Sequence, residues 1–158
     1  TVLKYCHWEL QSMAFWNSLS ALLHVKKEFQ TMFFQNQLHA PKVLRRGAWP
    51  GFAVHANVWM GQANTPVEYR IDDGAWQPMS RELKPDPAVL AENALDDAAP
   101  ALRGYDRLPE AATSTHLWRG TLPTNLDVGT HAIEVRARLE GFGSASARTS
   151  YQLRDAAP

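Results

Sequence analysis

The chain has 158 residues, 45% of them hydrophobic and 20% charged, which is enough for one domain with a hydrophobic core. Its formal net charge is zero, so the composition gives no sign of a nucleic-acid or anionic membrane partner. The single cysteine, Cys6, excludes an internal disulfide and a cysteine-rich zinc site, and no run of 18 apolar residues predicts a transmembrane helix.

Residues 1–38 contain no proline and no glycine, and their pattern fits two kinds of structure. Intrinsic propensity favours a helix, with an apolar stripe that includes Leu10, Met13 and Ala14. The stretches "SALLHVKK" and "TMFFQNQL" also suit short strands. The residues that follow, "HAPKVLRRGAWPGF", hold two prolines and two glycines and predict a loop.

Two strand patterns come next. "AVHANVWM" alternates, with one face formed by Val54, Ala56, Val58 and Met60. "PVEYRIDDGAWQPM" predicts a hairpin in which Val67, Tyr69 and Ile71 share a face. The turn is expected at Asp73-Gly74, because both residue types tolerate a positive φ, and the returning strand is expected over residues 75–79.

A long insertion is predicted around residues 80–113. It contains a helix signature in which Asp86 caps the N-terminus, Pro87 takes the first helical position and residues 88–98 are mostly good helix formers. Insertions of this length between strands usually act as a lid, a docking segment or a packed flap.

The last part of the chain predicts three strands, over residues 115–121, 131–139 and 145–153. In the second of these one face is apolar, and it consists of Ile133, Val135, Ala137 and Leu139. Short strands at this spacing predict an all-β fold, an antiparallel β-sandwich of the immunoglobulin or fibronectin-III kind. We expect one such domain over residues 1–158, with the partly helical insertion beside it.

Candidate chemistry is sparse. The sequence contains no nucleophile elbow, phosphate-binding loop, dinucleotide fingerprint or H-E-x-x-H motif. His116 and His131 fall on consecutive predicted strands and, with Glu134 or Asp127, could form the metal site of a small metallohydrolase. Their spacing matches no short metal motif, so we expect no metal site and no catalytic residue in this chain.

Six tryptophans raise a second possibility. Trp59, Trp76 and Trp118 all fall on predicted strands, and an exposed row of such rings could stack on sugars in a carbohydrate-binding module. The alternative, which we favour, is that these rings fill the space between the sheet and the insertion. Nearby arginines such as Arg70 and Arg119 could cover them.

Several motifs in fixed order carry a family resemblance. They are "ANVW", "DGAWQPM", the Asp-Pro start of the insertion, "S-x-HLWRG-x-LP" and "L-x-x-GTH-x-IEVRA". With these, residues 39–153 resemble the C-terminal domain of bacterial calcineurin-like metallophosphoesterases. The resemblance implies strands rather than a helix over residues 1–38, although the "F-D-G-N" turn typical of the family is missing there.

The resemblance also implies a function. In that family a separate, preceding domain binds two divalent metals through D-x-H, G-N-H-D/E and G-H-x-H motifs, none of which occurs here. The chain is then expected to be a non-catalytic accessory domain, without a cofactor, whose partner is the catalytic domain of the same polypeptide. Motif position suggests docking residues, namely His116, Trp118, Arg119, Trp76 and Trp59. Family members are often exported, which implies a periplasmic or secreted protein.

Overall fold

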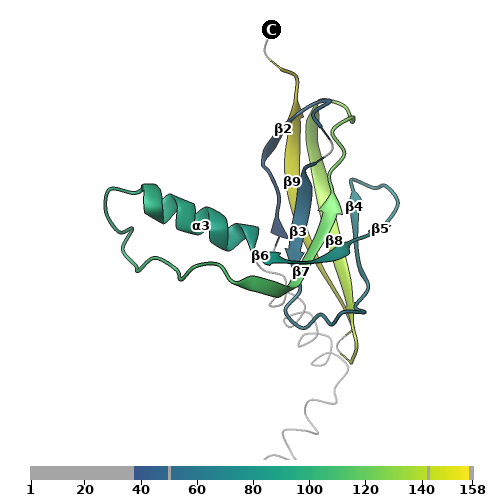
Figure 1. Cartoon of the computed structure of the whole chain (residues 1–158). Coiled ribbons are helices and arrows are strands. Elements are labelled where there is room, and N and C mark those ends of the chain that lie inside the picture. The colour runs from purple at the N-terminus through teal and green to yellow at the C-terminus, as the bar shows by residue number, and fades with distance from the viewer. Residues whose placement is uncertain (1–37, 50, 142, 157–158) are drawn as a thin grey trace, which may run out of the picture.

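Two β-sheets lie face to face in the computed structural model (Figure 1), which describes residues 38–49, 51–141 and 143–156. The strands expected over residues 1–38 therefore lie outside the described residues, apart from Leu38. The first sheet, sheet A, has four strands in the order β1 (Leu38–His39), β3 (Ala53–Asn57), β7 (Thr113–Thr121) and β6 (Ser80–Pro85). Sheet B has five, in the order β2 (Val43–Arg45), β9 (Gly143–Arg154), β8 (Gly129–Leu139), β4 (Val67–Ile71) and β5 (Gln77–Pro78).

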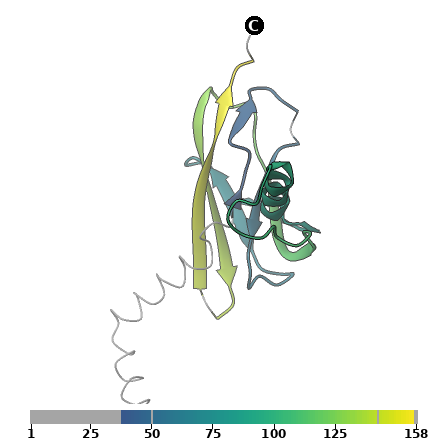
Figure 2. The ribbon, with the colours of Figure 1, turned by 90° about the vertical axis from the view of Figure 1, so that its left-hand side faces the viewer.

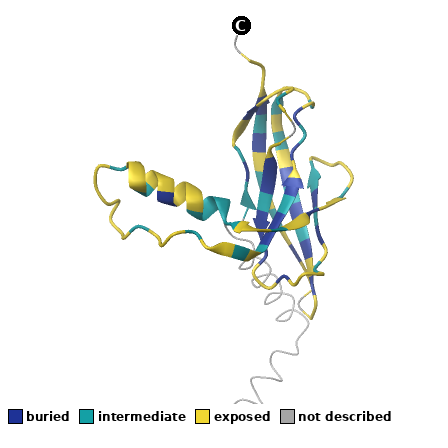
Figure 3. Ribbon diagram, in the orientation of Figure 1, coloured by how far each residue is buried: buried dark blue, intermediate teal, exposed yellow. Residues whose placement is uncertain are grey.

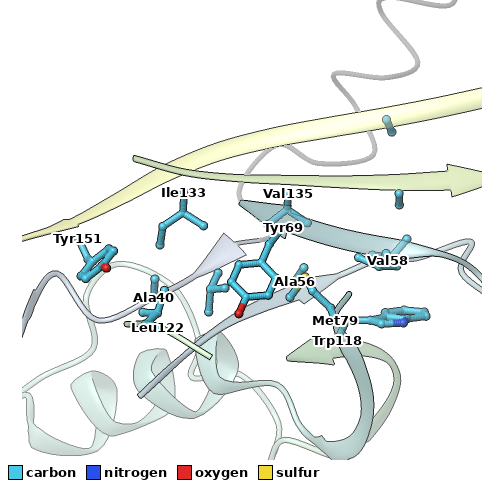
Figure 4. Close-up of a cluster of buried hydrophobic side chains, with 14 of the residues drawn as sticks. Ala40, Ala56, Val58, Tyr69, Met79, Trp118, Leu122, Ile133, Val135 and Tyr151 are labelled. Carbon is cyan, nitrogen blue, oxygen red and sulfur yellow. The ribbon is translucent and has the colours of Figure 1, made fainter. Parts of the chain in front are cut away.

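The apolar alternation predicted from the sequence forms the core between these sheets. Val54 and Ala56 of β3, and Ile133, Val135 and Ala137 of β8, have no exposed surface. Figure 4 shows side chains of both sheets meeting in this core, and Figure 3 shows the buried positions along the strands. Met60 departs from the prediction and is 42% exposed, because β3 ends at Asn57 before reaching it.

The all-β sandwich is confirmed, and three details of the prediction are wrong. Residues 39–52 are not only a loop, since they contain β2, which pairs in parallel with β9 and so breaks the antiparallel pattern. Residues 80–85 are not part of the insertion, because they form the edge strand β6 against β7. The returning strand of the hairpin is limited to Gln77–Pro78, an edge position that tolerates proline.

The hairpin turn also differs from the expectation. The residue with a positive φ is Asp72, at 50°, and neither Asp73 nor Gly74 adopts one. Asp72 is held in this conformation by its own side chain, since Oδ1 accepts a hydrogen bond of 2.8 Å from the backbone N–H of Ala132. The bond joins the turn to β8, and aspartate is among the residue types that tolerate the left-handed region better than most.

The helix of the insertion, α3 (Pro87–Ala98), begins as predicted. The Asp86 side chain caps it, with Oδ1 accepting from the backbone N–H of Ala88 at 2.8 Å, and proline occupies the first turn. Figure 1 shows α3 projecting sideways from the sandwich, and Figure 2 looks along its axis. Residues 99–112 return beside the helix to β7, and we call residues 86–112 the arm. Within the described residues, no helix has the length and apolar character needed to cross a membrane.

Candidate docking surface

The histidines proposed as metal ligands are not neighbours. They fall on consecutive strands as expected, but His116 lies on β7 of sheet A and His131 on β8 of sheet B, so these two strands do not pair. Glu134 accepts from Arg70 and Arg148 across sheet B, at 2.6 and 3.2 Å. Among the described residues, no group of three or more His, Cys, Asp or Glu side chains is placed to hold a metal ion.

His131 instead stabilises the β4–β5 turn. Its Nδ1 lies 2.8 Å from Oδ2 of Asp72 and its Nε2 lies 2.9 Å from the carbonyl oxygen of Asp127. Because both ring nitrogens face acceptors, the doubly protonated ring satisfies both bonds. The hydrogen bond with Asp72 raises the pKa of His131 above its ordinary value, although burial opposes this, and the same bond lowers the pKa of Asp72.

This pair predicts a pH-dependent contribution to stability. Because the pKa of His131 is raised on folding, protonation of the ring stabilises the fold below pH 6.5, the ordinary pKa. This stabilisation is lost as pH rises through the folded-state pKa. Because the pKa of Asp72 is lowered on folding, the ionised carboxylate stabilises the fold above pH 3.8, the ordinary pKa. This stabilisation is lost as pH falls through the folded-state pKa. We expect His131→Asn to lower the free energy of unfolding by about 0.5–1 kcal/mol near pH 5.5 and by less near pH 9. Urea unfolding at both pH values checks this, and an equal loss at the two would contradict it.

His55 provides the control of opposite sign. Burial lowers its pKa, with the carboxylate of Glu82 opposing that effect. A lowered histidine pKa costs stability as pH falls below 6.5, because the unfolded chain then binds the proton more readily. His55→Asn should therefore lessen the loss of stability on acidification, whereas His131→Asn should increase it.

The three tryptophans lie in different environments and do not form a row. Trp118 is 2% exposed and belongs to the core. Trp76 precedes β5 and is contacted by two arginines, with Cζ of Arg70 and Cζ of Arg136 at 4.8 and 3.9 Å from its ring centroid. Trp59 follows β3, so it and Trp76 are not on strands as predicted. These positions do not assemble the sugar-stacking surface that a carbohydrate-binding module would need.

Trp59 and His116 form a pair of rings beside sheet A, in which Trp59 is exposed and His116 is half-buried. Trp59 is 54% exposed, and its ring centroid lies 5.8 Å from that of His116. Nδ1 of His116 is buried without a hydrogen-bond partner. Of the docking residues suggested by the motifs, Trp118 is not available for contact, because its side chain lies in the core.

Arg119 belongs to a charged cluster on the outer face of sheet A. Its Nε lies 3.9 Å from Oε1 of Glu82, and Oε2 of Glu82 lies 3.6 Å from Nε2 of His55. The guanidinium also donates to the carbonyl oxygen of Gly51 at 3.2 Å. Among the described residues Arg119 lies over no tryptophan ring. Arg81 does, with its Cζ 6.0 Å from the ring centroid of Trp118.

An open cleft of about 500 Å³ lies beside the core, lined by Gly47, Ala48, Tyr69, Ile71, Gln77, Thr121, Leu122, Pro123, Thr124 and Asn125. Tyr69 is the one ionisable side chain in this lining. Its hydroxyl donates to the carbonyl oxygen of Thr121 at 2.7 Å, and burial raises its pKa. A phenol that is protonated and already hydrogen-bonded is a poor general base.

The arm carries the feature that the sequence analysis missed. Side chains facing the returning segment are polar: Asn93 is 4% exposed, and its Nδ2 donates to the carbonyl oxygen of Pro109 at 3.1 Å. The opposite side is apolar and faces outward, with Leu90 and Leu95 48% and 55% exposed. Leu90, Ala94 and Ala98 are spaced at i, i+4 and i+8, and this spacing could have been recognised in the sequence.

The comparisons with known proteins give the family. A model described as "C terminal of Calcineurin-like phosphoesterase" matches residues 25–144, which is well over half of the chain and includes the whole arm. Searches of the curated proteins and of the solved structures returned no match. On the family match, this chain belongs to the C-terminal domains of calcineurin-like phosphoesterases.

Proposed function

We propose that the chain is a non-catalytic accessory domain of a bacterial metal-dependent phosphoesterase, a hydrolase of phosphoric esters. In this proposal it packs against, or shapes access to, a separate catalytic domain of the same polypeptide, and that domain holds the two divalent metals. The observation that carries the proposal is the family match over residues 25–144, because the family is by description C-terminal to a phosphoesterase. The separation of His116 from His131 is consistent with chemistry located elsewhere.

The proposal also includes the residues that contact the catalytic domain and the location of the protein. Trp59, His116 and Arg119 are proposed as contacts with the catalytic domain, supported by their place outside the core on or beside sheet A. A periplasmic or secreted location is proposed on the family resemblance alone. No nucleic acid and no membrane is proposed as a partner, in line with the zero formal net charge.

The proposal is tested by comparing three proteins with a generic phosphodiester, in the presence of Mn²⁺ or Zn²⁺. They are the 158-residue chain, the longer polypeptide with both domains, and the longer polypeptide without this domain. The expected result is no hydrolysis by the chain alone and hydrolysis by the longer polypeptide. Removal of the domain should change the activity or thermal stability of what remains. Metal-dependent hydrolysis by the chain alone would overturn the proposal.

A further inference from the structure

The amphipathic character of α3 is reversed relative to an ordinary surface helix. A helix on a globular protein normally buries its apolar face and presents its polar face to water. In α3 the buried residue is Asn93, whereas the exposed side is formed by Leu90, Ala91, Ala94, Leu95 and Ala98. Figure 3 shows the arm exposed along most of its length. An apolar face of this kind is typical of helices that lie in a hydrophobic groove of a partner.

The arm is built to present this face in a fixed position. Arg103, on the returning segment, donates to Asp96 at 2.7 Å and to Glu92 at 2.8 Å. Arg107 pairs with Asp97 and with Glu110 in the same way. An isolated helix of 12 residues is marginal in water, so these ties to the returning segment help to keep α3 formed, although no other described element covers its apolar face.

The root of the arm lies beside the strand at which the described chain begins. This root is Asp86, whose Oδ2 accepts from Nδ2 of Asn57 at 2.7 Å. The neighbouring residue of β3, Ala56, pairs with Leu38, where the described chain begins. The described chain therefore enters the sandwich next to the root of the arm, whereas β9 leaves at the opposite end (Figure 1). The family match makes this chain the C-terminal part of a phosphoesterase, so the catalytic domain of the same polypeptide is the first partner to consider.

The charge of the arm distinguishes between two candidate partners. Residues 86–112 hold six acidic side chains and two arginines, and both arginines are already paired within the arm. Two copies of the chain that paired arm to arm would bring two acidic segments together, which is unfavourable. A groove with an apolar floor and a basic rim is complementary to the arm.

We propose that the apolar face of α3 docks into an apolar, basic-rimmed groove on the catalytic domain of the same polypeptide. This inference rests on the function proposed above and adds to it the element that makes the contact. Leu90 and Leu95 are the side chains that enter the groove, and the small alanines between them allow close approach of the partner surface.

The test uses the longer polypeptide that contains both domains. Leu90→Glu/Leu95→Glu places two charges on the apolar face without changing residues that tie the arm together, and both substitutions keep good helix formers. Val128→Glu is the matched control, because Val128 is 50% exposed on the loop before β8, at the end of the sandwich where β9 leaves. The radius of gyration from small-angle scattering and the sedimentation coefficient are measured for each protein. Circular dichroism of the 158-residue chain verifies that α3 still forms in the double variant.

The inference predicts a compact wild-type monomer, an increased radius of gyration in the double variant, and a control that matches the wild type. If the wild type is compact and the double variant stays equally compact, the domains dock through another surface and the inference fails while the proposed function stands. If removal of this domain changes neither the activity nor the stability of the rest, the proposed function itself fails. A wild type that dimerises and a double variant that is monomeric would assign the face to a second copy and overturn the inference.

Discussion

Trp118→Ala should lower the free energy of unfolding of this chain by about 3–5 kcal/mol, a large part of the total stability of a typical domain. The ring is 2% exposed and belongs to the core cluster between the two sheets. The backbone of Gly61 lies so close to it that an added Cβ would be 2.4 Å from a ring carbon, so little empty space surrounds the ring. Because the neighbouring strands cannot collapse fully into the space left behind, the loss includes a cavity contribution. Urea unfolding monitored by circular dichroism measures the effect.

Trp59→Ala is the matched control for this prediction. It removes the same side chain from a position that is 54% exposed, and it should cost less than about 1 kcal/mol. Equal losses for the two variants would contradict the assignment of Trp118 to the core. In the longer polypeptide, unchanged stability and unchanged activity after Trp118→Ala would exclude both a core role and a docking role.

Gly120→Ala is expected to destabilise the fold by about 1–3 kcal/mol, which is large for the addition of one methyl group. A Cβ at position 120 would lie 2.8 Å from two carbons of the Tyr69 ring, closer than real Cβ contacts allow. The ring cannot easily move away, since its hydroxyl donates to the carbonyl oxygen of Thr121 at 2.7 Å. The free energy of unfolding in guanidinium chloride is the quantity to compare.

A control and a double variant separate this clash from a general effect of replacing glycine. Gly51→Ala should be nearly neutral, because its Cβ would make an ordinary contact of 3.4 Å with the ring of Trp49. Tyr69→Leu combined with Gly120→Ala should cost less than the sum of the single changes, because the smaller side chain removes the clash. Strict additivity would show that Gly120 is needed for another reason.

The core of this fold could be predicted from the sequence, because strands that bury every second residue show an alternation of apolar and polar residues. The alternation around Val54 and Ile133 specifies which faces meet, and the Asp86-Pro87 pair specifies where the helix begins. Strand β6 shows no such alternation in the sequence. It is an edge strand with an exposed or half-buried pattern, so "SRELKP" shows no alternation, and its pairing with β7 is decided by contacts far away in the sequence.

The placement of the histidines could not be predicted for a related reason. Residues 122–128 look like a turn between neighbouring strands, but they carry the chain from sheet A to sheet B, with Leu122 fully buried on the way. Whether two consecutive strands pair or change sheet depends on packing rather than on local residue preferences. His116 and His131 therefore lie on strands that are consecutive in the sequence but belong to different sheets.

The outward apolar face of the arm could be predicted only in part from the sequence. It was present in the spacing of Leu90, Ala94 and Ala98, but spacing alone predicts burial of that face within the domain. The opposite outcome follows from Arg103 and Arg107, which attach the returning segment to the polar side of the helix. The sequence thus contains the amphipathic pattern, and the structure shows which side of the helix is left exposed by the described residues.

Amide hydrogen exchange gives the most direct measurement of whether this arm meets the catalytic domain. The 158-residue chain and the longer polypeptide with both domains are compared under the same conditions, with peptides that cover α3 (Pro87–Ala98) and the strand β9. The account predicts slower exchange in α3 when the catalytic domain is present and unchanged exchange in β9. Unchanged exchange in α3, together with new protection elsewhere on the sandwich, would contradict it.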